Sequence, residues 1–232
     1  MSQTATKTFK LSPSTLSVFR DCPRCFWLDK IKSIKRPRGI FPSLPSGMDR
    51  VIKVFFDEYR VLKKPPGDLK GPDFQGVELF EDQKQLDLWR DWKTGLQYKS
   101  PDGSVLFGAL DDLLVKDGKY IPFDYKTKGS PTNEESAVKY YQTQLDCYSL
   151  MLEANGLDTE DYGFLLYFSP KTVRERGGVE FEVQPIKIAL DSRRAKAIFE
   201  NAIQLLNGPL PLSAPACEYC AWLRHFKTPF KS

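Results

Sequence analysis

Apolar residues recur at helical spacing in four segments of the chain and predict four helices. The predicted helices begin at Ser12 or cover about residues 48–62, 133–154 and 191–206. Pro13 stands in the first turn of the first helix, where a missing N–H costs nothing. Thr132 and Glu135 have the spacing of a capping box before the third helix, and Gly156 lies beyond its end. Prolines and glycines predict a loop over residues 35–47.

Four other segments are rich in β-branched and aromatic residues, which is typical of strands. They cover residues 105–115, 120–126, 162–168 and 179–188. The dipeptide Asp117-Gly118 between the first two is a strong hairpin signal, and the last two flank a basic loop over residues 171–178. The order of elements predicts an α/β fold of the α+β type, with a central mixed β-sheet flanked by helices. We expect residues 1–232 to form a single domain.

The turn at Asp117-Gly118 also predicts how its two strands pair. If it is a two-residue loop, Lys116 pairs with Lys119. Counting back along both strands then places Asp111 opposite Asp124. Directly opposed side chains have Cβ atoms ~4.5–5.5 Å apart, so two ionised carboxylates there repel each other.

A cation would relieve that repulsion. Lys126 lies two residues after Asp124, and strand alternation puts it on the same face. A divalent metal held by the carboxylate oxygens of Asp111 and Asp124 would do the same. The alternative is a solvated end of the sheet in which Lys126 is only an ion-pair partner, and a β-bulge would change the register altogether.

Composition excludes several classes of protein. The chain has 232 residues, of which 41% are apolar and 28% charged, so it can bury a core and is not a disordered segment. Its longest uncharged run, residues 201–217, is interrupted by glycine and prolines and does not predict a membrane span. The first residues contain no apolar signal segment, so we expect a cytoplasmic protein without membrane partners.

Positive charge is concentrated near the start of the chain. Residues 1–40 hold nine lysines and arginines against two aspartates, a net charge of +7, whereas the whole chain carries +4. This asymmetry indicates a polyanionic partner such as nucleic acid. A solvated basic face explains the charge equally well.

Five ordered segments resemble the PD-(D/E)XK nuclease superfamily, and most closely its RecB-like branch, which includes the CRISPR-adaptation exonucleases. They are LSPSTLSVFRDCPRCFWL at 11–28, GALDDLL at 108–114, PFDYKTKG at 122–129, QLDCY at 144–148 and ACEYCAW at 216–222. The resemblance covers nearly the whole chain and implies a restriction-endonuclease-like core. Each motif is weak alone, but their order is specific.

The resemblance also implies roles for the residues of the hairpin. Asp111 and Asp124 would bind Mg²⁺ or Mn²⁺, with the carbonyl of Tyr125 as a further ligand. Lys126 would orient or activate the attacking water and stabilise charge on the phosphate. Phosphodiester hydrolysis needs a metal that polarises the phosphate and lowers the pKa of water, so the chemistry agrees with the opposed carboxylates.

Three further residues enter through the resemblance. Gln144 and Tyr148 lie one helical turn apart and would face the active site and the DNA, although Tyr148 also belongs to an apolar stripe that predicts packing. Many relatives have a histidine ligand in the helix after the first loop, but the only histidine here is His225. Asp49 stands in the matching segment, either as an oxygen ligand or as a carboxylate favouring a helix N-terminus.

Four of the five cysteines form two Cys-x-x-Cys pairs, and the fifth, Cys147, is expected to be a buried structural thiol. The two pairs are Cys22 with Cys25 and Cys217 with Cys220. Such pairs favour a four-thiolate metal site over disulfides.

A shared metal would join the N-terminal segment, about residues 12–30, to the C-terminal segment, about 209–232. The relatives often hold a four-iron four-sulfur (4Fe-4S) cluster with one N-terminal and three C-terminal cysteines. The two-and-two arrangement leaves both Zn²⁺ and an iron–sulfur cluster open. Four unliganded thiols are the remaining alternative.

These features predict a metal-dependent DNA nuclease, exonuclease-like on single-stranded or frayed DNA, in DNA repair, recombination or CRISPR adaptation. Phe19, Phe26 and Trp27 in the basic N-terminal stretch are expected to stack on bases, and residues 171–176 to contact phosphates. The alternative is a catalytically weak nucleic-acid-binding or interaction subunit of a larger repair or CRISPR complex. The chain has no Walker-type loop, so unwinding would need a partner protein.

Overall fold

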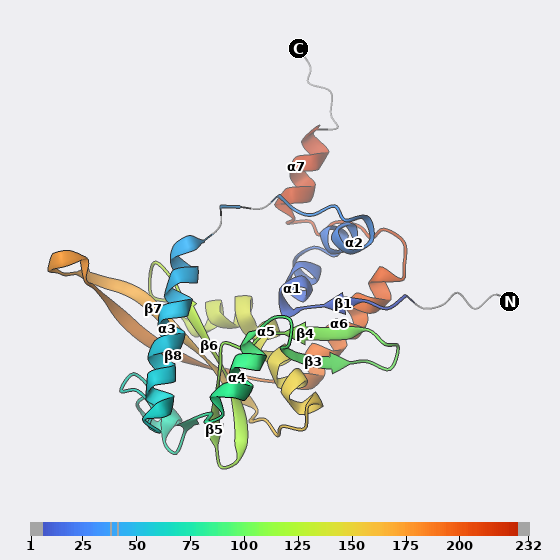
Figure 1. Ribbon diagram of the computed structural model, residues 1–232. Helices are drawn as coiled ribbons and strands as arrows, with labels where there is room; N and C mark the ends of the chain where they lie inside the picture. Colours follow the sequence, from blue (N-terminus) through green and yellow to red (C-terminus); the bar gives the residue numbers. More distant parts are fainter. Residues whose placement is uncertain (1–6, 38, 41, 227–232) are drawn as a thin grey trace.

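The computed structural model describes residues 7–37, 39–40 and 42–226 (Figure 1). For residues 225 and 226 it describes the backbone only, so the side chain of His225 lies outside the described part of the structure. Arg38 of the basic N-terminal stretch and the last part of the C-terminal segment, residues 227–232, lie outside the described residues.

Two mixed β-sheets form the centre of the fold (Figure 1). The larger has the order β2-β5-β6-β7-β8, in which β6 and β7 are parallel and the other neighbours antiparallel. Its strands are β2 (Glu78–Leu79), β5 (Asp112–Lys116), β6 (Lys119–Thr127), β7 (Tyr162–Val173) and β8 (Val179–Ala189). The smaller has the order β1-β4-β3, with β1 (Lys10–Leu11), β4 (Val105–Gly108) and β3 (Leu96–Lys99).

The described part of the chain contains seven α-helices, most of which lie around these sheets, whereas the last one projects away from them (Figure 1). They are α1 (Pro13–Asp21), α2 (Pro23–Lys32), α3 (Ser43–Val61), α4 (Gln83–Arg90), α5 (Glu134–Ala154), α6 (Ser192–Leu206) and α7 (Glu218–Phe226), with short 3₁₀ turns at Pro72–Phe74 and Glu175–Gly177. The expected class, a mixed sheet flanked by helices, is therefore confirmed, with a second sheet added. None of these helices has the length and apolar character that a membrane span requires.

The two faces of the larger sheet meet different helices. Phe123 and Tyr125 of β6 pack against Phe56 of α3, with ring centroids 5.5 and 4.8 Å from that of Phe56. Because side chains alternate along a strand, Asp124 and Lys126 face the opposite side, where α5 lies. The candidate catalytic residues thus lie between a rigid sheet and the longest helix.

Local signals predicted the helix ends well, with two exceptions. Ser12 caps α1 as expected, accepting a hydrogen bond from the backbone of Thr15. The predicted capping box at Thr132 and Glu135 is wrong, because Asn133 is the N-cap of α5 and its side chain accepts from the Ser136 N–H. The predicted loop 35–47 is too long, since α3 already begins at Ser43.

The predicted strand 105–115 is two strands in different sheets. The chain leaves β4 after Gly108 and enters β5 at Asp112. Between them, the N–H of Leu110 donates to the Trp89 carbonyl at 3.0 Å, and the Asp111 carbonyl accepts from Arg90 at 2.7 Å. The end of α4 therefore satisfies backbone groups that a continuous strand would have given to a neighbour.

The hairpin register was predicted correctly as far as the ladder extends. Lys116 pairs with Lys119 and Asp112 with Phe123, so Asp111 lies one residue beyond the last pair. The last hairpin is longer than expected, because residues 171–173 belong to β7 and the turn covers only about residues 174–178. It projects from the body of the protein (Figure 1).

Candidate active site and cysteine cluster

Asp124 and Lys126 meet on the face of β6 that is turned toward α5. The Asp124 side chain is completely buried, and its Oδ2 is in ion-pair contact with the Lys126 ammonium. Gln144 of α5 donates from Nε2 to Asp124 Oδ1 at 2.9 Å and lies 2.6 Å from the Tyr148 hydroxyl. Tyr148 is itself buried in the core, so it both packs and contacts the site.

Asp111 lies next to this group, directly before β5, and contacts a lysine that the sequence analysis did not identify. Lys53 of α3 lies with its Nζ 2.8 Å from Asp111 Oδ1 and 2.9 Å from Asp49 Oδ2. Among the contacts described, Asp49 is therefore linked to Asp111 indirectly, through the ammonium group of Lys53.

The electrostatic surroundings shift the pKa values of the two carboxyl groups in opposite directions. Burial and the charge of Asp111 raise the pKa of Asp124 to about 7, although the Lys126 ammonium opposes this. Burial also raises the pKa of Asp111, but the ammonium groups of Lys53 and Lys126 outweigh burial, and that pKa lies below its usual range. Burial lowers the pKa of Lys126, but the two aspartates raise it above its usual value, so Lys126 is charged at neutral pH.

This arrangement fits a divalent cation. Asp124 Oδ2 is buried without a hydrogen bond, although Lys126 pairs with it electrostatically. A carboxylate oxygen without a hydrogen bond, next to a second carboxylate, is the kind of hard oxygen donor that Mg²⁺ or Mn²⁺ prefers. The Tyr125 side chain faces away from the site and donates to Asp112 at 2.5 Å, so only its carbonyl remains as a candidate ligand.

A buried ionic network behind Asp111 was missed by the sequence analysis. Asp112 is fully buried and accepts from Arg60 at 2.7 and 2.8 Å and from Arg90 at 3.1 Å. Arg90 also donates to the Asp111 carbonyl at 2.7 Å and pairs with Asp57 at 2.8 Å. These bonds hold the backbone of Asp111 in place.

A sequence signal for this network was present on α3. Lys53, Asp57 and Arg60 recur at helical spacing, yet Arg60 is only 5% exposed. Charged residues on the buried face of a helix indicate ionic partners elsewhere in the fold. The sequence alone does not name those partners, because Arg90 and Asp112 lie far along the chain.

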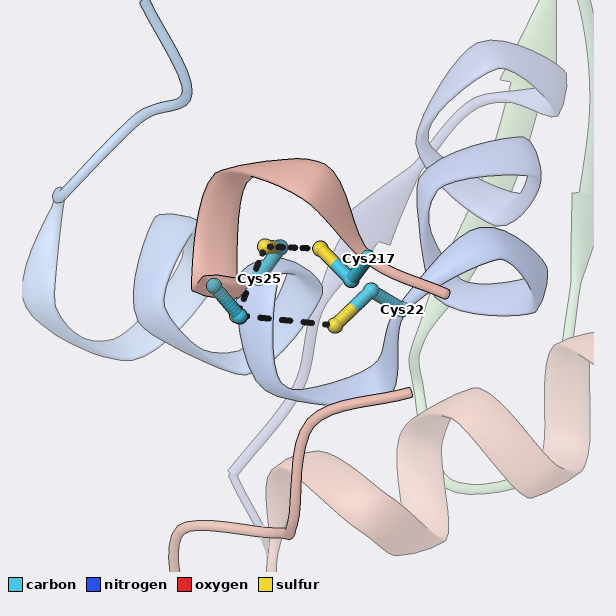
Figure 2. Close-up of side chains that lie close together, drawn as sticks. Cys22, Cys25 and Cys217 are labelled. Atoms are coloured by element: carbon cyan, nitrogen blue, oxygen red, sulfur yellow. Dashed lines mark hydrogen bonds between the residues drawn. The ribbon is translucent and has the colours of Figure 1, made fainter. Parts of the chain in front are cut away.

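The four cysteines of the two Cys-x-x-Cys pairs come together, with all four sulfurs within 4.8 Å of one another (Figure 2). Cys25 Sγ lies 3.6 Å from both Cys217 Sγ and Cys220 Sγ, and Cys22 Sγ lies 3.9 Å from Cys220 Sγ. All four side chains are buried and none forms a disulfide. The cluster could therefore hold a metal, and it joins the N-terminal helices to α7.

Polar groups around Cys22 favour its thiolate, whereas burial raises the pKa of Cys25 and Cys220. Burial raises the pKa of Cys22, but N–H groups of Cys25 and Ala214 outweigh burial and lower it to about 7. The Ala214 N–H lies 3.4 Å from Cys22 Sγ, and Arg36 Nη2 lies 3.7 Å from Cys217 Sγ. Cys147 is buried in the main core, away from the cluster, as expected.

One of the expected stacking residues is not exposed. Phe26 is fully buried, so its assignment as a base-stacking platform is wrong, whereas Phe19 and Trp27 are half-buried and pack against the core. The indole of Trp27 donates to the Gly208 carbonyl at 3.0 Å. These residues hold α1, α2 and the end of α6 together instead.

Comparison with known proteins identifies the superfamily of the chain. A sequence model described as the PD-(D/E)XK nuclease superfamily matches residues 72–224, more than half of the chain. The matched region contains Asp111, Asp124, Lys126 and Gln144. No match was found among curated proteins. The chain belongs to the PD-(D/E)XK nuclease superfamily.

Proposed function

We propose that this protein is a divalent-metal-dependent deoxyribonuclease. Membership of the superfamily supports a phosphodiester-hydrolysing enzyme with nucleic acid as substrate. The observation that carries the proposal is the convergence of Asp111, Asp124, Lys126 and Gln144 on one buried point. Lys126 and Lys53 pair with the two carboxylates, yet the buried Asp124 Oδ2 accepts no hydrogen bond, which leaves an oxygen acceptor for a divalent cation.

Each side chain has a separate task in this proposal. Gln144 occupies Asp124 Oδ1, which leaves Oδ2 for a Mg²⁺ or Mn²⁺ ion together with Asp111 and the Tyr125 carbonyl. When bound, such a cation polarises the phosphate and lowers the pKa of water. Lys126 stays protonated, orients the attacking water and balances the charge that builds on the phosphate.

Asp49 has a supporting task. Its carboxylate holds Lys53, and Lys53 in turn holds Asp111. We therefore assign Asp49 to positioning Lys53, in place of the metal-ligand role expected from its position in the sequence. Lys53 also supplies a positive charge next to Asp111.

The substrate and biological setting follow from the resemblance. The ordered motifs favour the RecB-like branch, exonuclease-like action on single-stranded or frayed DNA, and a setting in DNA repair, recombination or CRISPR adaptation. The chain carries no nucleotide-binding loop of the Walker type, so strand separation in that setting would come from another protein.

We further infer that the cysteine cluster holds Zn²⁺. A tetrahedral ion with thiolates at about 2.3 Å places the sulfurs about 3.8 Å apart, and three pairs here lie 3.6–3.9 Å apart. A four-iron cluster needs more widely spaced thiolates, because irons and sulfides lie between them. The site is buried and offers no fifth ligand among the described cysteines, which is typical of a structural zinc.

A cleavage assay tests the nuclease. The protein is incubated with end-labelled single-stranded DNA, duplex DNA and RNA, with Mg²⁺, Mn²⁺ or EDTA. We expect metal-dependent cleavage of single-stranded DNA that Lys126→Ala abolishes. Lys128→Ala is the matched control, because Lys128 bonds Thr132 outside the site, and it should cleave normally. Normal cleavage by Lys126→Ala, or none by the wild type with either metal, would refute the proposal.

A further inference from the structure

A groove runs beside the candidate active site, between α1 and α5. Its volume is about 500 Å³. Ser14 and Ser17 line it from α1, Tyr140 and Gln144 from α5, and Trp92 from the turn after α4. The groove lies on the same side of the larger sheet as Asp124.

The groove leads directly to the proposed catalytic residues. Gln144 lines it and also donates to Asp124 at 2.9 Å. Tyr141 lines it too, and its ring centroid lies 4.6 Å from the Lys126 ammonium. A chain lying in the groove would therefore pass the point where cleavage is proposed.

Two aromatic side chains in the groove are unusually exposed. Trp92 is 66% exposed and Tyr140 is 64% exposed, although both offer a large flat apolar surface. Neither belongs to a core cluster, so packing does not explain them. Each has a lysine ammonium near its ring, with Lys93 5.6 Å and Lys139 5.5 Å from the centroids.

Positively charged side chains line a continuation of the groove beyond Tyr140. A second hollow shares Ser17 and Tyr140 with the first and is lined by Arg20, Lys139 and Arg36. Arg36 is paired with Asp21 of the same hollow, at 2.5 Å. Arg20 and Lys139 form no ion pair with a carboxylate in the part of the chain that the structure describes, so their charge is available to an anion.

We propose that these two hollows form one binding track for single-stranded DNA, in which bases stack on Trp92 and Tyr140 and phosphates contact Arg20 and Lys139. Flat exposed aromatics alternating with uncompensated cations are the surface that single strands recognise. A duplex covers its base faces by stacking, so it cannot use the same two rings. The proposal rests on the nuclease function and names the substrate form that the site accepts.

Binding of a fluorescently labelled oligo-dT, followed by anisotropy, tests the track. All variants carry Lys126→Ala, so that the DNA stays intact. Stacking contributes about 1–3 kcal/mol per base, which corresponds to roughly 5- to 150-fold in affinity per ring. We expect Trp92→Ala with Tyr140→Ala to weaken binding at least about tenfold, and Trp92→Phe with Tyr140→Phe to restore most of it.

A matched control removes an exposed aromatic outside the groove. Trp222 of α7 is 58% exposed and does not line either hollow of the track. Trp222→Ala should bind oligo-dT within about twofold of its parent, since it leaves both stacking rings in place. Urea unfolding confirms that each variant is folded, which the exposure of Trp92 and Tyr140 leads us to expect.

The phosphate contacts are tested by the salt dependence of binding. Lys139→Gln should reduce the slope of log affinity against log salt by about 0.7, the value for one phosphate contact on a single strand. An unchanged slope would remove Lys139 from the track. Equal binding by the double alanine variant and its parent, or no binding of oligo-dT by either, would overturn the track as a whole.

Failure of the track and failure of the nuclease are distinguishable. If the wild type cleaves single-stranded DNA, and the two alanine substitutions change neither binding in the Lys126→Ala protein nor cleavage in the protein that keeps Lys126, the nuclease stands and the track is wrong. If oligo-dT binds through Trp92 and Tyr140 but no metal supports cleavage, the track stands and the nuclease is wrong.

Discussion

Removing the C-terminal half of the cysteine cluster should cost this protein much of its stability. In Cys217→Ser with Cys220→Ser, the N-terminal pair alone cannot complete a tetrahedral site. The metal then no longer joins α2 to the start of α7. Cys25 and Cys217, which contact each other in the fold, are 192 residues apart in the sequence. A cross-link closing a loop of that length limits the unfolded chain, and its loss costs about 5 kcal/mol in the chain-entropy model.

That free energy can be measured by urea unfolding with and without a strong chelator. The wild type with its metal should be about 5 kcal/mol more stable than the double variant, and chelation should bring the wild type down to the variant. The variant itself should be insensitive to chelator. Elemental analysis of anaerobically purified protein should find one zinc per chain in the wild type and none in the variant.

Cys147→Ser is the matched control. Its sulfur is fully buried outside the cluster, so the new hydroxyl should cost about 1–3 kcal/mol without changing the metal content. Wild-type protein with neither zinc nor iron would refute the shared site. Full metal content in the double variant would refute the assignment of its ligands.

Four further outcomes are expected. Asp124→Asn should stabilise the metal-free protein at pH 8 and not at pH 4. The pKa of Asp124 is near 7 in the folded protein against the ordinary 3.8, so its contribution to stability is present below pH 3.8 and is lost as pH rises through 7, about 4 kcal/mol in urea unfolding. A variant that is less stable than the wild type at pH 8 would contradict this. Asp111→Asn should instead lower the melting temperature at pH 8. Lys53 and Lys126 lower the pKa of Asp111, so its negative charge is stabilising. An increase in melting temperature would show that repulsion from Asp124 dominates. Asp112→Asn should lower the free energy of unfolding by about 3–5 kcal/mol, since Arg60 would stay buried without its partner, and a loss below 1 kcal/mol would show that water replaces it. Arg36→Gln should weaken zinc binding in competition with a chelator, because the guanidinium at 3.7 Å balances thiolate charge, and unchanged affinity would remove that role.

Features that depend on neighbours in sequence were predictable. The turn at Asp117-Gly118 set the pairing of Lys116 with Lys119, because a two-residue loop leaves one register for its strands. Ser12 and Asp191 cap their helices through side chains that bond N–H groups two or three residues away. Two Cys-x-x-Cys pairs indicated one shared site, because this spacing is typical of four-thiolate metal sites, and the structure brings all four sulfurs within 4.8 Å of one another.

Parts of the proposed site were predictable for the same reason. Asp124 and Lys126 share a face because strand side chains alternate, and Gln144 and Tyr148 share one because helix residues four apart do. Neither the strand nor the helix periodicity predicts that these two faces contact each other. The contact of Gln144 with Asp124 depends on how α5 packs on the larger sheet.

Only the tertiary structure decided the features whose partners come from distant segments. The break between β4 and β5 arises because the end of α4 bonds the backbone at Leu110 and Asp111. Arg60 is buried because Asp112 pairs with it, and Trp92 is exposed because none of the described helices covers it. Periodicity and turn chemistry determine local conformation through short-range bonds, whereas burial, ionic partners and exposed rings depend on which elements pack together, and the chain folds to satisfy all of these contacts at once.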